Sequence, residues 1–245
     1  MFPIFVKNSF YIKQTPSTNA LSWVMNREKS LPEGLVIYTD FQSAGKGQPG
    51  NEWESSKGMN LLFSVILHPV QVPIDELFLI SQLVSISIKK ALDEYTTNIT
   101  VKWPNDIYWN DKKLAGILIE NSLQGNKIMS VVVGIGLNVN QKLFLSNAPN
   151  PVSLIQIKRK RVNRKQLLQQ ICQNIMGLYS EMDKEKIRKI YAESLFRKSG
   201  LFTFEANNET FQAKIKDVRP DGILELETEK GELKSFYFKE VQFII

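Results

Sequence analysis

The sequence contains a single cysteine, Cys172, and a single histidine, His68, among its 245 residues. One cysteine excludes an internal disulfide and a cysteine-based zinc site, and it suits a reducing, cytoplasmic setting. One histidine provides no histidine metal cluster and little basis for a Ser-His-Asp triad. His68 follows the apolar run 61–67 and precedes Pro69, as is typical of a strand end. We therefore expect chemistry that depends on positioning and charge rather than on a covalent nucleophile.

Long hydrophobic runs are also missing. No stretch of about 18 apolar residues occurs, so we expect no membrane partner. Residues 1–14 lack the basic start and the small-residue cleavage site of a signal peptide. The composition, with 43% hydrophobic and 23% charged residues, is that of a globular protein. A net charge of +6 suits anionic ligands such as phosphates without by itself indicating nucleic acid.

Hydrophobic periodicity predicts an α+β chain divided in two. Helices are expected at 16–27, 74–95, 164–182 and 184–196, with Ser17 and Asn163 as N-caps. Strands are expected at 34–42, 60–67, 99–103, 113–120 and 128–140. From about Gly200, short alternating runs at 201–206, 209–218, 222–228 and 232–238 predict a small β-barrel. We place the boundary between domains 1–197 and 198–245, and expect the barrel to pack on its neighbour because it is small.

Three glycines, Gly45, Gly47 and Gly50, follow the spacing G-x-G-x-x-G. A dinucleotide fingerprint needs a helix that begins at the glycines, whereas a strand is expected next here. Walker A needs a Gly-Lys-Ser/Thr sequence, and a protein kinase needs H-R-D and D-F-G sequences; the chain has neither set. Two alternatives remain: a plain hairpin loop, or a loop whose backbone N–H groups and Lys46 close over a phosphate.

Polar residues adjoin three of the expected strands. The segment "VKWPNDIYW" places Lys102, Asn105 and Asp106 around a proline turn. Asn138 follows two glycines at a strand end, where a backbone can approach a ligand closely. Lys113 begins a strand that is apolar on both faces, so its amine needs an anionic partner unless it is simply the polar end of a hairpin.

The ordered motifs "STN" (17–19), "QSAGKGQPGNEW" (42–53), "KWPND" (102–106), "KLAGILIE" (113–120) and "GIGLNV" (134–139) form a recognisable set. This set resembles the biotin–protein ligases, also called biotin–[acetyl-CoA-carboxylase] ligases. The resemblance extends over nearly the whole chain, including a helix after Ser153 and Leu154 and the C-terminal barrel. It implies a mixed β-sheet flanked by helices plus an SH3-like barrel. Many bacterial members carry an N-terminal winged helix that binds operator DNA. Because the STN motif lies at residues 17–19, with little sequence before it, we expect a monofunctional ligase that binds no DNA.

The resemblance implies a two-step reaction with biotin, ATP and Mg²⁺ and no tightly bound cofactor. The carboxylate of biotin attacks the α-phosphorus of ATP, which gives biotinyl-5′-AMP and pyrophosphate. A lysine of a biotin carboxyl carrier domain, part of a biotin-dependent carboxylase, then attacks the mixed anhydride and releases AMP. Family members include monomers and dimers joined by sheet edges, and we expect a homodimer.

The same resemblance assigns roles to individual residues. Lys113 is the expected catalytic residue, together with Lys46. The expected biotin-binding residues are Ser17, Thr18, Asn19, Gln42, Gly45, Lys46, Gly47, Lys113 and Gly116. The expected nucleotide-binding residues are Gln48, Trp53, Lys102, Asn105, Asp106 and Asn138, with Asp106 also the candidate Mg²⁺ ligand. Trp53 has the alternative of being a core aromatic residue, and Trp103 is expected in the core.

The glycine loop departs from the commonest family pattern, Gly-Arg-Gly-Arg-Arg-Gly-Arg. Lys46 stands at the first arginine position, and Gln48, Pro49 and Asn51 stand at the others. Lysine keeps the charge but loses the two-pronged geometry of arginine. Gln48 and Asn51 can form hydrogen bonds but cannot neutralise phosphate, so we expect the grip on the adenylate to depend on the lysines.

Two rival interpretations remain open at this stage. Lipoate or octanoate ligation shares the catalytic fold and the adenylation chemistry, although "KWPND" and the Gly-Lys-Gly loop favour biotin. The basic run Ile157 to Lys165, together with a small barrel, suggests a nucleic-acid-binding module. That run is short, lacks interleaved aromatic residues and leads into a capped helix, so we expect a solvated surface loop.

Overall fold

The computed structural model describes residues 8–48, 50–125, 127–146 and 149–245. Seven strands form one sheet in the order β1-β2-β3-β7-β6-β5-β4. These strands are β1 (Ser9–Ile12), β2 (Val36–Thr39), β3 (Leu61–Leu67), β4 (Ile99–Lys102), β5 (Asp106–Trp109), β6 (Lys112–Gln124) and β7 (Lys127–Leu137). β1 pairs with β2 in parallel and every other neighbouring pair is antiparallel. The expected mixed sheet is therefore confirmed.

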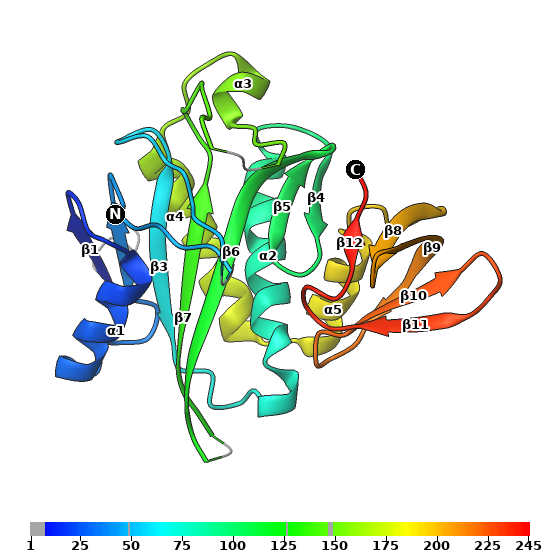
Figure 1. Cartoon of the computed structure of the whole chain (residues 1–245). Helices are drawn as coiled ribbons and strands as arrows, with labels where there is room; N and C mark the ends of the chain where they lie inside the picture. Colours follow the sequence, from blue (N-terminus) through cyan, green and yellow to red (C-terminus); the bar gives the residue numbers. More distant parts are fainter. Residues whose placement is uncertain (1–7, 49, 126, 147–148) are drawn as a thin grey trace.

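Helices cover both faces of this sheet (Figure 1). They are α1 (Thr18–Lys29), α2 (Phe78–Asp93), α3 (Leu154–Lys158), α4 (Arg164–Glu181) and α5 (Lys184–Glu193), with a 3₁₀ turn at Ile74–Glu76 before α2. Side chains alternate along a strand, so successive residues of β3 belong to different layers. Phe63 and Val65 join the main core with α2 and α4, whereas Ile66 packs with Val132 beneath α1. Ser64 shares the α1 face with Ile66.

A second sheet follows, with five antiparallel strands in the order β11-β10-β9-β8-β12. Its strands are β8 (Phe202–Ala206), β9 (Glu209–Val218), β10 (Leu224–Thr228), β11 (Leu233–Phe236) and β12 (Gln242–Phe243). The small C-terminal β-unit is thus present, while its SH3-like character stays a prediction. Phe204 and Leu224 belong to the same buried cluster as Val101 of the large sheet. The two sheets therefore share one core, and the boundary at 197/198 also stays a prediction.

Trp103 links the two sheets, since its indole donates to the Gly222 carbonyl oxygen at 2.9 Å and packs edge-on against Phe238. The side chain is 2% exposed, so its expected place in the core is confirmed. The expected N-caps are confirmed as well: Ser17 Oγ accepts from the Ala20 N–H. Asn163 accepts from the N–H groups of the first turn of α4.

Sequence periodicity missed β1 and β5, two of the strands that have only four residues. Such strands are too short to show a clear alternation, and β5 lies where only the turn after Pro104 was expected. The basic run Ile157 to Lys165 is only partly the loop that we expected. Ile157 and Lys158 belong to α3, which begins with a capping box between Ser153 and Gln156. None of the described helices is both long and apolar enough to cross a bilayer.

Candidate active site

A cavity of about 520 Å³ opens on the α1 face of the large sheet. Its walls come from the start of α1, the glycine loop, strands β5 to β7 and the segment after Asn138. Every site residue expected from the sequence lines it except Gly45, whose carbonyl oxygen accepts from the Trp53 N–H at 3.0 Å. Pro49 lies outside the described residues. Motifs that are far apart in the sequence thus meet around one space of the size of a small-molecule site.

Uncharged hydrogen-bonding groups form one end of the cavity. Gln42 Oε1 accepts from the backbone N–H and the hydroxyl of Thr18, at 2.8 and 3.0 Å. Thr18 and Asn19 are 3% and 5% exposed, and both contact the hydroxyl of Ser64 beneath them. Ser17 also lines this end. Because Thr18, Asn19 and Gln42 are hydrogen-bonded to one another or to Ser64, they hold a fixed arrangement of donors and acceptors.

Trp53 lies against the two glycines in the middle of the cavity. A Cβ atom at Gly116 would approach its ring to 2.9 Å, and a Cβ atom at Gly136 would overlap the indole. The Nε1 atom of Trp53 is buried and has no hydrogen-bond partner among the described residues. Trp53 is therefore a wall residue with a donor still to be satisfied, whereas its contact with adenine stays a prediction.

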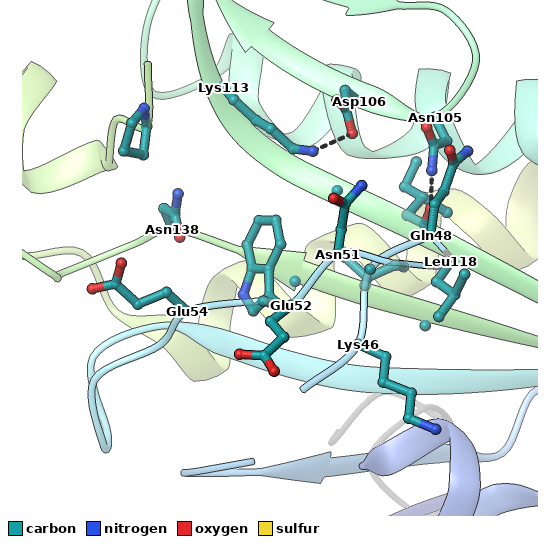
Figure 2. A pocket seen from close by; sticks show the side chains of 18 of the residues that line it. Lys46, Gln48, Asn51, Glu52, Glu54, Asn105, Asp106, Lys113, Leu118 and Asn138 are labelled. Atoms are coloured by element: carbon teal, nitrogen blue, oxygen red, sulfur yellow. Dashed lines mark hydrogen bonds and ion pairs between the residues drawn. The ribbon is translucent and has the colours of Figure 1, made fainter. Parts of the chain in front are cut away.

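Charged groups form the other end of the cavity. Lys113 Nζ lies 2.7 Å from Asp106 Oδ1, an ion pair between β6 and β5 that Figure 2 shows. The anionic partner that the position of Lys113 requires is thus Asp106. Asn105 Nδ2 donates to the Ile117 carbonyl oxygen at 2.6 Å, which fixes the turn before β5 to β6. The ion pair leaves Lys113 directed at the cavity with one carboxylate neighbour.

Lys102 is a second cation at this end, and it lies at the contact with the C-terminal sheet. Its Nζ atom is 5.5 Å from the ring centre of Tyr108 and 4.9 Å from that of Phe243. No carboxylate oxygen of the described residues lies within ion-pair distance of it. Burial lowers the pKa of this amine; attraction to Asp106 opposes the shift and repulsion from Lys113 adds to it. An anionic ligand would stabilise its charged form.

The glycine loop is a hairpin. The Gly47 N–H donates to the Asn51 carbonyl oxygen and the Asn51 N–H donates to the Gln48 carbonyl oxygen, both at 2.9 Å. Lys46 is exposed, and its side chain points away from the Lys113–Asp106 pair, whereas Gln48 and Asn51 lie on the cavity side (Figure 2). The loop thus has hairpin hydrogen bonds and Lys46 does not lie beside the other cations, while closure of the loop over a phosphate stays a prediction.

Asn138 and Glu54 shape the rim. Asn138 is 3% exposed and its Oδ1 atom has no hydrogen-bond partner among the described residues, so an acceptor is still available there. Glu54 accepts from the N–H groups of Leu145 and Ser146, at 2.9 and 2.8 Å. Burial raises the pKa of Glu54, but hydrogen bonds from Ser146 and Leu145 shift it downwards overall. Sequence reasoning missed Glu54, since its partners are about ninety residues away.

The described residues contain no group of three or more His, Cys, Asp or Glu side chains that could hold a metal ion. Asp106 is the carboxylate at the charged end of the cavity. The basic run is mostly exposed, and two of its side chains make structural contacts: Lys158 donates to the Tyr95 carbonyl oxygen, and Arg164 pairs with Asp40.

The chain is similar to known proteins in sequence and in fold. The sequence model of the Biotin/lipoate A/B protein ligase family matches residues 11–138, which include the N-terminus of α1, the glycine loop, Lys102, Lys113 and Asn138. The chain belongs to the biotin/lipoate A/B protein ligase family. Among its relatives is the bifunctional ligase/repressor BirA of Bacillus subtilis (strain 168), 30% identical over 222 residues that cover 87% of this chain and 67% of that protein.

Two other ligases extend the comparison. The biotin–[acetyl-CoA-carboxylase] ligase of Mycobacterium tuberculosis is 32% identical over 137 residues, which cover 53% of this chain and 48% of that protein. The fold is similar to that of the biotin protein ligase from Aquifex aeolicus solved in complex with biotin and ATP. The TM-score is 0.79 at 24% identity, over 97% of this chain and 100% of that one. The likeness includes the C-terminal sheet, which the family match does not reach.

Proposed function

We propose that this chain is an ATP-dependent biotin–protein ligase, which forms biotinyl-5′-AMP and transfers biotin to a lysine of a biotin carboxyl carrier domain. One observation carries the proposal: a single cavity joins a neutral hydrogen-bonding end to a cationic end. Biotin has the matching polarity, with an uncharged cyclic urea at one end and a carboxylate at the other. Membership of the family supports the adenylation chemistry.

The neutral end favours biotin over lipoate or octanoate. Thr18 and Asn19 are buried and Gln42 is half-buried, and a cyclic urea can pair with these polar side chains. The dithiolane of lipoate and the alkyl chain of octanoate offer no such partners, so each hydrogen bond to the ring that they fail to form would cost roughly 0.5–1.5 kcal/mol of binding free energy. Ser17 takes part in binding the urea through its backbone and hydroxyl groups at the start of α1.

The charged end supports the first step. A carboxylate oxygen of biotin forms a bond to the α-phosphorus of ATP while the bond from that phosphorus to the bridging oxygen breaks, and pyrophosphate leaves. Two anions must approach each other, so catalysis requires cations at the meeting point. Lys113 serves this role, Lys102 binds the remaining phosphate charge, and Asn105 and Asn138 orient the nucleotide.

Mg²⁺ fits this end as an ion that arrives with ATP. Proteins commonly hold Mg²⁺ through one or two carboxylates plus substrate phosphates, and Asp106 provides one carboxylate here. The ion would supply further neutralisation of phosphate charge.

In the second step the amine of the carrier lysine forms an amide bond to the carbonyl carbon of the mixed anhydride, loses its proton, and displaces AMP. The groups around the cavity exclude water from this anhydride.

A homodimer joined through a sheet edge is part of the proposal. β1 and β4 are the two outer strands of the large sheet. Val101 of β4 is bridged by the backbone around Leu195, so β1 is the more open edge of the described strands. Light scattering across a concentration range would measure the mass in solution. The single buried cysteine agrees with action in a reducing, cytoplasmic compartment.

Mass spectrometry of an apo carrier domain, incubated with the protein, ATP, Mg²⁺ and biotin, tests the function. We expect the addition of one biotinyl group to one lysine, and none when ATP or biotin is omitted or when EDTA is present. Parallel incubations with lipoate and octanoate should give no product. Modification by either of those acids in place of biotin, or no modification of several carriers, would contradict the proposal.

A further inference from the structure

Asn19 makes hydrogen bonds that fix the orientation of its amide group. Its Nδ2 group donates to the Leu118 carbonyl oxygen at 3.3 Å and to Glu120 Oε2 at 3.0 Å. A carbonyl oxygen and an ionised carboxylate can only accept, so both N–H bonds of the amide are used. The orientation of the amide follows from the chemistry of these two acceptors.

Ser64 fixes the other half of the same amide. Its side chain is fully buried, and its Oγ atom lies 2.6 Å from Asn19 Oδ1 and 2.7 Å from Thr18 Oγ1. The amide oxygen can only accept, so the single proton of Ser64 is directed at Asn19, and the Thr18 hydroxyl shares its own proton between Ser64 Oγ and Gln42 Oε1. An amide oxygen has two lone pairs, so Oδ1 can accept one further hydrogen bond, and Asn19 lines the cavity.

Two further contacts keep the amide from turning over. Glu120 Oε2 also accepts from the Trp23 indole N–H at 3.1 Å, which holds the carboxylate in place. Gly134 lies directly beneath Asn19, and a Cβ atom there would overlap the amide group. A reversed amide would place its NH₂ group against the Ser64 hydroxyl and its oxygen against Glu120, which costs free energy in a buried site.

We propose that Ser64 and Glu120 are positioning residues that hold the Asn19 amide so that it offers only its oxygen, a hydrogen-bond acceptor, to a ligand. This end of the cavity then selects a ligand ring that bears an N–H donor. The inference rests on the proposed function, because it takes that ring to be the cyclic urea of biotin. Neither residue touches the reacting atoms: Ser64 is fully buried, and Glu120 acts through Asn19.

Steady-state kinetics of carrier biotinylation with three variants tests this role. In Ser64→Ala and Glu120→Ala the amide loses one of its fixed partners, and KM for biotin should rise roughly 5- to 20-fold, the equivalent of one lost hydrogen bond. KM for ATP should stay within about twofold. Glu120→Gln retains an oxygen that can accept from both Asn19 and Trp23, and it should restore a KM for biotin close to that of the wild type.

Discrimination against biotin methylated at a ring nitrogen provides a second readout. The wild type should reject this analogue, and the ratio of KM for the analogue to KM for biotin should shrink in Ser64→Ala, because the amide oxygen then loses the hydroxyl that holds it in place. Ser87→Ala is the matched control, since Ser87 is also fully buried and donates to the Leu83 carbonyl oxygen within α2, away from the cavity.

Several results would overturn the inference. Equal increases in KM for biotin and ATP, or an unchanged KM for biotin in both alanine variants, would show that the network does not orient Asn19. Failure of Glu120→Gln to restore binding would point to the charge rather than the hydrogen bonds. If the wild type is active and the variants have the same KM for biotin and the same discrimination as the wild type, this inference alone is refuted. If the wild type neither binds nor transfers biotin, the proposed function is refuted with it.

Discussion

Replacing Lys113 by alanine separates the chemical role of its amine from its place in the fold. The amine lies 2.7 Å from Asp106, and the side chains of the pair are 27% and 17% exposed. Such a partly solvated pair contributes roughly 0–1 kcal/mol to stability. We therefore expect Lys113→Ala to fold normally, with at most a small decrease in its unfolding temperature.

Catalysis should respond far more strongly. A cation about 4 Å from an anionic group contributes about 4 kcal/mol at an effective dielectric constant of about 20. Because each 1.4 kcal/mol changes a rate about tenfold, this corresponds to a loss of about 1,000-fold in adenylate formation. Mutations that remove a single preorganised donor from an active site typically cost about 10²- to 10³-fold, which agrees with this magnitude.

Pyrophosphate release in the absence of carrier isolates the first step for this measurement. Lys112→Ala is the matched control, since it removes the same charge from the adjacent, exposed position of β6. We expect the control to retain nearly full activity and a normal thermal melt. Near-normal pyrophosphate release by Lys113→Ala would remove Lys113 from the mechanism. Equal losses in the two variants would indicate a general charge effect.

Three further substitutions address other parts of the cavity. Burial lowers the pKa of the Lys102 amine, so the unfolded chain binds the ammonium proton more tightly than the folded chain does. Below the ordinary lysine pKa, this difference lowers the free energy of unfolding. Lys102→Met should therefore raise the unfolding temperature without nucleotide while raising KM for ATP; a lower unfolding temperature would contradict this. Gly136→Ala places a Cβ atom in the Trp53 indole and should cost roughly 1–3 kcal/mol of stability in denaturant unfolding, whereas Gly177→Ala, with open space around it, should not destabilise. Gln48→Arg adds a cation on the cavity side of the loop and should slow release of biotinyl-AMP from the enzyme; an unchanged release rate would refute that.

The Lys113–Asp106 pair shows how far the sequence could lead. A lysine in a strand with two apolar faces predicted an anionic partner, and both residues were named as site residues. Their pairing was not predicted, because it depends on the register of β5 against β6, which shifts between Ile107 and Tyr108. β5 itself was missed, so no register could be assigned. Residue types near strand ends thus identified the chemistry, while the strand pairing determined which groups meet.

Ser64 and Phe243 had no comparable signal. Ser64 lies within an apolar run that correctly predicted a buried strand, but its partners on α1 are 45 and 46 residues away and depend on how α1 crosses the sheet. Phe243 reaches Lys102 only because the C-terminal sheet packs on β4. Long-range packing of this kind leaves no periodic trace in a sequence, and only the fold reveals it.

The hairpin form of the glycine loop sharpens the question of how phosphate charge is neutralised. At the charged end, the two lysines and Asp106 sum to one net positive charge, since Asp106 offsets Lys113. Lys46 is exposed and directed elsewhere, and Gln48 and Asn51 bring no charge to the cavity. A triphosphate and a carboxylate together carry more negative charge than one cation can offset. In the proposed reaction the remaining neutralisation therefore comes from Mg²⁺, or from Lys46 once the loop takes a different arrangement around the ligands. Because lysine lacks the two-pronged geometry of arginine, Lys46 would hold the adenylate in a fixed orientation less firmly than an arginine-rich loop would.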